Sequence, residues 1–342
     1  MSIKFGVALP TGYEGLIFPP PFASPESITR IAVAAEEMGF DSVLPNDHFS
    51  TQNYVRQMLD RPPNYFDPFV SLAYVAAHTR RIRLITGVIV LPLRDPTGVA
   101  KQAASLDHFC QGRLVLGVGI GAYREEFLAV RPERRGWNRG EVVTDAIRAI
   151  RVLLEQRDAT YHGQFFAFDN VQMFPKPYQA RLPIYVGGNA EANLQRAAEL
   201  GEGWLPAVMS PAEIRAGVTR IRELAAAAGR DLAGFEVAPQ LSISLGRTQA
   251  EAEQKFYASH AYKHIVSLKN STLKGQQGQS EARNLLGSPN QIVDRIGQYA
   301  EAGVTEITGL IFCVDTVDEV LANMEVFARD VMPQLKKDPA RA

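Results

Sequence analysis

Residues 81–121 read RIRLITGVIVLPLRDPTGVAKQAASLDHFCQGRLVLGVGIG and contain one complete repeat of the fold. An apolar run at 82–90 predicts a strand, residues 96–109 predict a helix, and residues 113–118 predict a second strand. This order favours two parallel strands that are joined by a crossover helix.

The same alternation continues in both directions along the chain. Strands are predicted at 4–9, 42–45, 82–90, 113–118, 183–187, 203–206, 235–245 and 305–312. Helices are predicted at 25–39, 67–78, 96–109, 139–155, 190–200, 211–228, 288–302 and 316–329. Eight strand–helix units close an α/β (β/α)8 TIM barrel, so we expect a single domain over 1–335 and a disordered tail at 336–342. Residues 46–66 after strand 2 and 260–287 after strand 7 are long for such connections, and we expect both to be insertions.

The composition fits a soluble enzyme with one large core. Hydrophobic residues make up 46% of the chain, and 36 basic side chains balance 37 acidic ones to give a net charge of −1. This balance argues against a nucleic-acid partner, and two cysteines are too few for a disulfide scaffold. No apolar run approaches the roughly 18 residues of a membrane span, and the N-terminus lacks a signal-peptide pattern. We therefore expect a cytoplasmic protein without a membrane partner.

The end of the second strand carries the residues best suited to proton transfer. Asn46, Asp47, His48 and Phe49 follow this strand, at the end where barrels place their active sites. A carboxylate beside an imidazole can orient a proton carrier, which makes Asp47 and His48 a candidate catalytic pair. A turn with an N-cap aspartate and an exposed histidine would give the same pattern.

Glycines mark three further strands. Gly87 interrupts the third strand, which often indicates a bulge or the close approach of a ligand. The motif GVGIGA at 117–122 matches the dinucleotide fingerprint, but no acidic residue ends a strand about 20 residues later, so a glycine-lined cofactor wall is the better interpretation. Gly187, Gly188 and Asn189 precede a helix, where backbone N–H groups favour a phosphate, although a simple capped turn would look the same.

The histidines do not show the spacing of a metal site. His260 and His264 could share one helix face, but no acidic or cysteine third ligand is fixed nearby. We therefore expect no metal.

Eight segments match, in the same order, the motifs of one known family. They are FDSVLPNDHF (40–49), DPF (67–69), RIRLITGVIVLPLRDP (81–96), AKQAASLDHFCQGRLVLGVGIGAYREEF (100–127), YHGQFFAFDNV (161–171), PIYVGGN (183–189), AAELGEGWLP (197–206) and GSPNQIVDRIGQYAEAGV (287–304). The chain resembles the bacterial luciferase-like family of flavin- or deazaflavin-dependent oxidoreductases. The resemblance implies a barrel that binds FMN or the deazaflavin coenzyme F-420 across its C-terminal mouth.

The resemblance also implies roles for single residues. Asp47 and His48 would lie near the reactive face of the cofactor ring, and the Gly87–Val88 peptide bond would be cis behind it. The residues expected to bind the cofactor are Thr86, Gly87, Val88, Gly119, Gly121, Gly187, Gly188 and Asn189. The residues expected to line the substrate are Asn46, Phe49 and Tyr123.

The leading hypothesis from this resemblance is a monooxygenase that uses reduced FMN and O₂ on a small organic substrate. In it, His48 moves a proton, Asp47 orients His48, and residues 260–287 close over the mouth. A deazaflavin-dependent hydride-transfer oxidoreductase and a non-catalytic flavin-binding protein are the alternatives. The partners expected are a separate flavin or deazaflavin reductase and a second copy of the chain in a homodimer.

Overall fold

A curled parallel sheet forms the centre of the computed structural model, which describes residues 3–267 and 280–336. Every segment predicted as a strand is present, and two of them are interrupted once. The segments are β1 (Lys4–Leu9), β2 (Ser42–Pro45), β3 (Arg83–Ile85) with β4 (Ile89–Val90), β5 (Leu114–Gly119), β8 (Ile184–Gly187), β9 (Gly203–Leu205), β10 (Glu236–Val237) with β11 (Gln240–Leu245), and β13 (Glu306–Phe312).

The strands follow the order β10-β9-β8-β5-β3-β2-β1-β13-β11, and the pairs are parallel. β10 and β11 stand at opposite ends of this order, yet both belong to the one segment 236–245. On one side the Ala238 N–H donates to the Trp204 carbonyl of β9 at 2.9 Å, and on the other the Thr305 N–H donates to the Val237 carbonyl at 3.0 Å. The sheet is therefore bonded on both sides of this segment, as a barrel requires.

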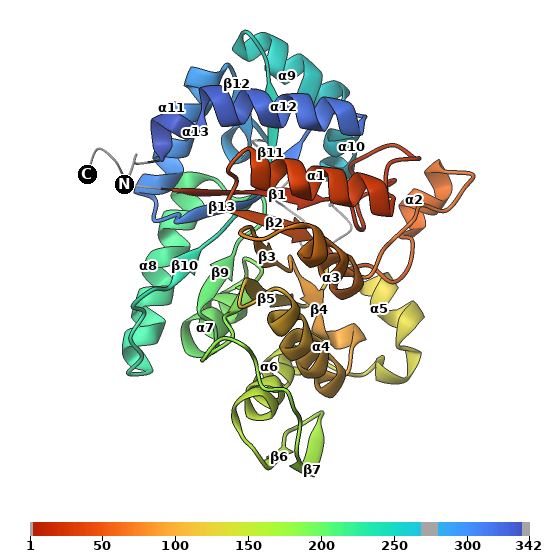
Figure 1. The fold of residues 1–342 in the computed structure, drawn as a ribbon, viewed down its shortest axis with the longest axis vertical. Helices are drawn as coiled ribbons and strands as arrows, with labels where there is room; N and C mark the ends of the chain where they lie inside the picture. The colour runs from red at the N-terminus through yellow and green to blue at the C-terminus, as the bar shows by residue number, and fades with distance from the viewer. Residues whose placement is uncertain (1–2, 268–279, 337–342) are drawn as a thin grey trace.

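The predicted helices surround these strands (Figure 1). They are α1 (Pro25–Glu37), α3 (Pro68–His78), α4 (Pro96–Phe109), α6 (Arg139–Glu155), α7 (Glu191–Leu200), α8 (Pro211–Ala227), α11 (Pro289–Glu301) and α12 (Val317–Asp330). Their starts follow ordinary capping chemistry, because Ser24 caps α1 with Pro25 in the first turn and Asp67 accepts from two N–H groups of α3.

Several short elements were not predicted as helices or strands. They are α2 (Asn53–Met58), α5 (Arg124–Val130), α9 (Gln249–Ala258), α10 (His260–Ser267), β12 (Leu285–Gly287), which pairs with β11, and α13 (Met332–Leu335). A hairpin is formed by β6 (Ala159–His162) and β7 (Ala167–Val171), and it lies away from the sheet in Figure 1. Residues 337–342 of the tail expected at 336–342, and residues 268–279 of the expected lid, lie outside the described residues.

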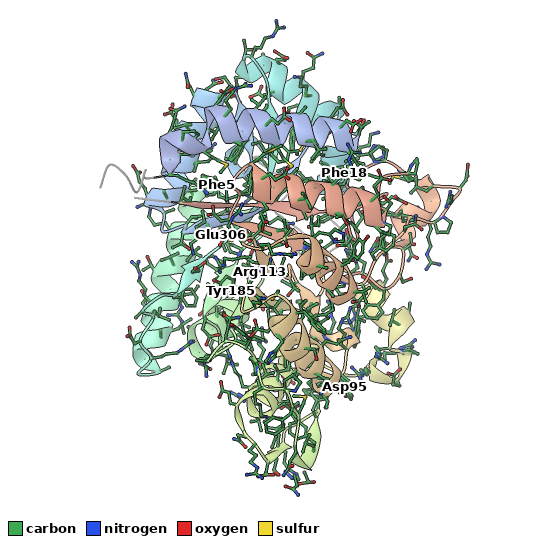
Figure 2. The ribbon with its side chains drawn as sticks, viewed as in Figure 1. Phe5, Phe18, Asp95, Arg113, Tyr185 and Glu306 are labelled. Atoms are coloured by element: carbon green, nitrogen blue, oxygen red, sulfur yellow. The ribbon has the colours of Figure 1, made fainter. Side chains whose placement is uncertain are left out.

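Charged side chains fill the sheet interior at the N-terminal ends of the strands. The Arg83 guanidinium donates to Glu306 Oε2 at 2.6 Å, to Glu236 Oε2 at 3.2 Å and to the Tyr185 hydroxyl at 2.9 Å. Lys4 Nζ donates to Glu236 Oε1 at 2.6 Å. Burial raises the pKa of Glu306, and Figure 2 shows Glu306 and Tyr185 near the middle of the molecule. This network occupies one end of the barrel and leaves the C-terminal ends of the strands for a cavity.

Within the described ranges, no helix has both the length and the apolar composition that crossing a lipid bilayer requires.

Candidate active site

A cavity of about 230 Å³ lies at the C-terminal ends of the barrel strands. Most of the predicted site residues line it: Asn46, Asp47, His48, Gly87, Val88, Gly119, Gly121, Tyr123, Gly187 and Gly188. The structure therefore brings together residues from four strand ends and from the loops that follow them.

Glycines on neighbouring strands leave room for the side chain of Val88. A Cβ atom at Gly187 would lie 2.7 Å from Val88 Cγ1, and a Cβ atom at Gly119 would lie 2.7 Å from Val88 Cγ2. The Gly87–Val88 peptide bond is cis, which confirms the expectation drawn from the resemblance. These residues form a smooth wall, here called the glycine floor (Gly87, Val88, Gly119 and Gly187), and its shape suits a planar ring.

The residue that follows β8, Gly188, has to be glycine. Gly188 has a φ of +113°, and a Cβ atom there would lie 2.2 Å from Asn193 Nδ2 on α7. The cavity reaches Gly188 just before this helix begins, where backbone N–H groups can receive an anion.

Three predicted site residues lie outside the cavity lining. The Asn189 side chain bonds the backbone of Ala207 in both directions, at 2.7 and 3.1 Å. The Thr86 hydroxyl is buried and donates to the Gly117 carbonyl at 2.8 Å. Phe49 is 45% exposed, with the Arg94 guanidinium 4.7 Å from its ring centroid. These contacts join neighbouring segments, so the structure gives no support for direct ligand contact by these three side chains.

Asp47 pairs with an arginine rather than with His48. Arg94 Nε donates to Asp47 Oδ2 at 2.9 Å, Arg94 Nη2 donates to Asp47 Oδ1 at 2.7 Å, and the Val90 N–H donates to Oδ2 at 3.0 Å. Arg94 also bonds Asp67, the N-cap of α3, at 2.7 Å. Both Asp47 oxygens are engaged by these donors, so the expectation that Asp47 orients His48 is wrong.

Glu126 is the carboxylate that holds His48. His48 Nδ1 lies 3.0 Å from Glu126 Oε2, and the N–H groups of Phe49 and Ser50 donate to Oε1 at 2.6 and 3.1 Å. Burial would raise the pKa of Glu126, but the hydrogen bond and charge of His48 and these N–H donors lower it below its usual range. Glu126 is therefore an ionised partner that fixes the imidazole ring.

Two further side chains lie beside the same imidazole. The Tyr65 hydroxyl donates to Gln52 Oε1 at 2.9 Å, and Gln52 Nε2 lies 3.1 Å from His48 Nδ1, to which this amide can donate only when Nδ1 carries no proton. Because Nδ1 faces Glu126 and Gln52, Nε2 is the ring nitrogen that remains for a ligand. His48 therefore has the geometry of a general acid or base with a fixed orientation.

A second histidine borders the cavity from α10. His264 Nδ1 lies 2.9 Å from the Tyr54 hydroxyl of α2, and the Tyr54 and Tyr123 hydroxyls are 3.5 Å apart. Burial, and secondarily the charge of His48, lower the pKa of His264 to about 4. The segments after the second and seventh strands therefore meet at the rim of the cavity.

Glu126, Arg94, Tyr54 and His264 were not predicted as site residues, because each acts through a partner distant in sequence. The described part of the chain contains no cluster of three or more His, Cys, Asp or Glu side chains that could hold a metal ion.

Comparisons with known proteins agree with this architecture. The profile of the family described as luciferase-like monooxygenase matches residues 3–306. The 5,10-methylenetetrahydromethanopterin reductase of Archaeoglobus fulgidus is 24% identical over 335 residues, which cover 88% of this chain and 93% of the reductase.

Solved structures include similar proteins of several kinds. The monooxygenase RslO1 of Streptomyces bottropensis is 25% identical, with a TM-score of 0.78 over 97% of this chain and 99% of that chain. An F-420-dependent secondary alcohol dehydrogenase, solved with an F-420–acetone adduct, has 19% identity and a TM-score of 0.79 over 98% and 100%. The oxygenating constituent of 3,6-diketocamphane monooxygenase from Pseudomonas putida, solved with FMN, has 15% identity and a TM-score of 0.73 over 99% and 100%. The last two show a shared fold.

Proposed function

The chain belongs to the luciferase-like monooxygenase family, and on that premise we propose that it is an oxidoreductase that interconverts a small alcohol and its carbonyl compound with a bound flavin or deazaflavin. The observation that carries this proposal is the pair of His48 and Glu126 in the cavity beside the glycine floor. Interconversion of an alcohol and a carbonyl compound moves one proton at the substrate oxygen, and an imidazole fixed by a carboxylate suits that task.

The residues at the mouth fit a planar, anionic cofactor. A side chain at Gly119 or Gly187 would collide with Val88, so these two positions carry no side chain and Val88 offers an apolar surface for a ring. The backbone at Gly188 and the start of α7 suit the phosphate that FMN and coenzyme F-420 both carry. When bound, such a cofactor exchanges the hydrogen of the substrate C–H bond together with two electrons.

His48 acts on the substrate oxygen through Nε2. As an alcohol is oxidised, its O–H proton passes to Nε2 while the C=O double bond forms, and in the reverse direction Nε2 returns the proton. Glu126 holds the ring and stabilises the positive charge that the ring gains. Asp47 and Arg94 keep the end of β2 in place.

A monooxygenase that uses reduced FMN and O₂ is the second candidate. The monooxygenase RslO1 supports it, since it is 25% identical and covers 97% of this chain. For the monooxygenase, and for reduction of a carbonyl compound, we further propose that a separate reductase supplies the reduced cofactor. For either reaction we propose that the chain works as a homodimer and that residues 46–66 and 260–287 are insertions that shape the substrate rim.

Cofactor titration followed by turnover tests the proposal. The purified protein is titrated under nitrogen with coenzyme F-420 and with FMN, and the loaded protein is mixed with secondary alcohols while cofactor absorbance is recorded. We expect anaerobic cofactor reduction by the alcohol, and a His48→Ala variant with an unchanged Kd for the cofactor but turnover lower by roughly 10²–10⁴-fold. The control is His162→Ala, on the β6–β7 hairpin, with unchanged turnover. Turnover that requires O₂ would instead support the monooxygenase.

A further inference from the structure

Apolar side chains form much of the cavity wall beyond the glycine floor. Leu16 and Ile17 come from the loop after β1, and Ala261 and Ile265 come from α10. The bond between His264 and Tyr54 ties α10 to α2 at the rim, so this wall has a fixed position over the mouth. A ligand above the floor therefore contacts mostly hydrocarbon.

The ionised groups of the cavity are already paired. The described lining residues include Asp47 and Glu126 but no lysine or arginine. The two oxygens of Asp47 are bonded by Arg94, and Glu126 is bonded by His48 and two backbone N–H groups. His264, with a pKa of about 4, is neutral at pH 7. Neither a ligand carboxylate nor a ligand ammonium group finds an unpaired counter-charge among these residues.

We propose that the substrate is a neutral, largely apolar alcohol or ketone whose single polar oxygen binds at His48 and whose carbon skeleton lies against Leu16, Ile17, Ala261 and Ile265. This inference rests on the proposed function, because it names the substrate class of that same site. The physical reason is that a buried charge without a partner is costly, whereas one hydroxyl or carbonyl oxygen is satisfied by one imidazole.

The test compares pairs of ligands that differ in one carboxylate. Protein loaded with the cofactor that it binds is titrated with 2-pentanone and 4-oxopentanoate, and with longer pairs up to ten carbons, while binding is measured by calorimetry. We expect neutral ketones to bind at least about 100-fold more tightly than the paired keto acids. Equal or tighter binding of the keto acids, or binding of neither class, would overturn the proposal.

A charge placed in the apolar wall should change this preference. We expect Ile265→Arg to improve keto-acid affinity at least tenfold, whereas Ile265→Met should keep the native preference. Leu16→Lys makes the same test from the loop after β1, in case one variant does not fold as judged by circular dichroism. A preference unchanged in the variants that fold would count against the proposal.

The same titration separates the two hypotheses. Ketone binding to protein that carries the reduced cofactor, without oxidation of that cofactor, would mean that the proposed reaction is wrong while the ligand class is right. Turnover of hydroxy acids in preference to neutral alcohols would mean that the proposed reaction is right while the ligand class is wrong.

Discussion

Replacing Glu126 with glutamine tests whether the negative charge of this carboxylate stabilises the protonated imidazole of His48. The substitution keeps the length of the side chain and one acceptor oxygen but removes the negative charge. Glu126 accepts from His48 Nδ1 at 3.0 Å and from the Phe49 and Ser50 N–H groups at 2.6 and 3.1 Å. A hydrogen bond to a charged group contributes about 1.5–3 kcal/mol and a neutral one about 0.5–1.5 kcal/mol, so the bond to His48 should weaken by about 1–2 kcal/mol.

The weaker hydrogen bond mainly raises the free-energy barrier of the step in which the imidazole becomes positively charged. Since about 1.4 kcal/mol corresponds to tenfold in rate, kcat should fall by roughly 5- to 30-fold. The Kd of the cofactor should stay within about twofold, because Glu126 lies on α5 and the glycine floor is formed by other segments. The assays are initial-rate kinetics and cofactor fluorescence titration on the same preparation.

Glu125 provides a matched control on the same helix. It accepts from the Asn53 N–H at 2.8 Å and is not a cavity residue, so Glu125→Gln removes an equal charge without touching His48. We expect its kcat to remain within about twofold of the native value. An unchanged kcat in Glu126→Gln, or an equal loss in both variants, would refute a role for the Glu126 charge.

Three further predictions concern stability and cofactor binding. Arg94→Met leaves Asp47 buried without its cation, so urea titration should show a loss of roughly 3–5 kcal/mol in the free energy of unfolding, and a loss under about 1 kcal/mol would contradict the pairing. Gly187→Ala places a methyl group 2.7 Å from Val88 Cγ1; the cofactor Kd should rise at least about tenfold with unchanged circular dichroism, and an unchanged Kd would argue against the glycine floor. His264 has a folded pKa of about 4 against an ordinary 6.5, so the unfolded chain binds its proton first and stability should fall as pH drops from 6.5 towards 4. His264→Gln should flatten this slope in thermal melts, whereas identical slopes would exclude His264 as its source.

The strand framework was predictable because local patterns determine it. Runs such as FGVAL (5–9) and GLIFC (309–313) are apolar on both faces, as strands buried in a parallel sheet are. Helix starts were predictable for a similar reason, since Ser24 with Pro25 satisfies the first N–H groups of α1 without distant partners. The Gly87–Val88 cis bond was different, because only the resemblance to a family indicated it.

The partners within the site could not be predicted from local patterns. Asp47 and His48 are adjacent in sequence, and adjacency suggested one working pair. In the structure their side chains have different partners, Arg94 and Glu126, which are distant in the chain. Glu126 lies on the short helix α5, which was not predicted from the sequence, so nothing local indicated that its carboxylate enters the cavity. The bond of the Asn189 side chain was not indicated either, because its partner Ala207 belongs to the next strand–loop unit.

The glycine floor has a consequence for engineering this protein. Val88 is confined by glycines on two different strands, so a single larger residue at Gly119 or Gly187 requires Val88 to move. The opposite wall has no such constraint in the described residues, because Leu16 and Ile265 come from a loop and a helix that lie outside the barrel strands. Mutant libraries that hold the floor constant and vary that wall should therefore alter substrate range while keeping the cofactor site intact.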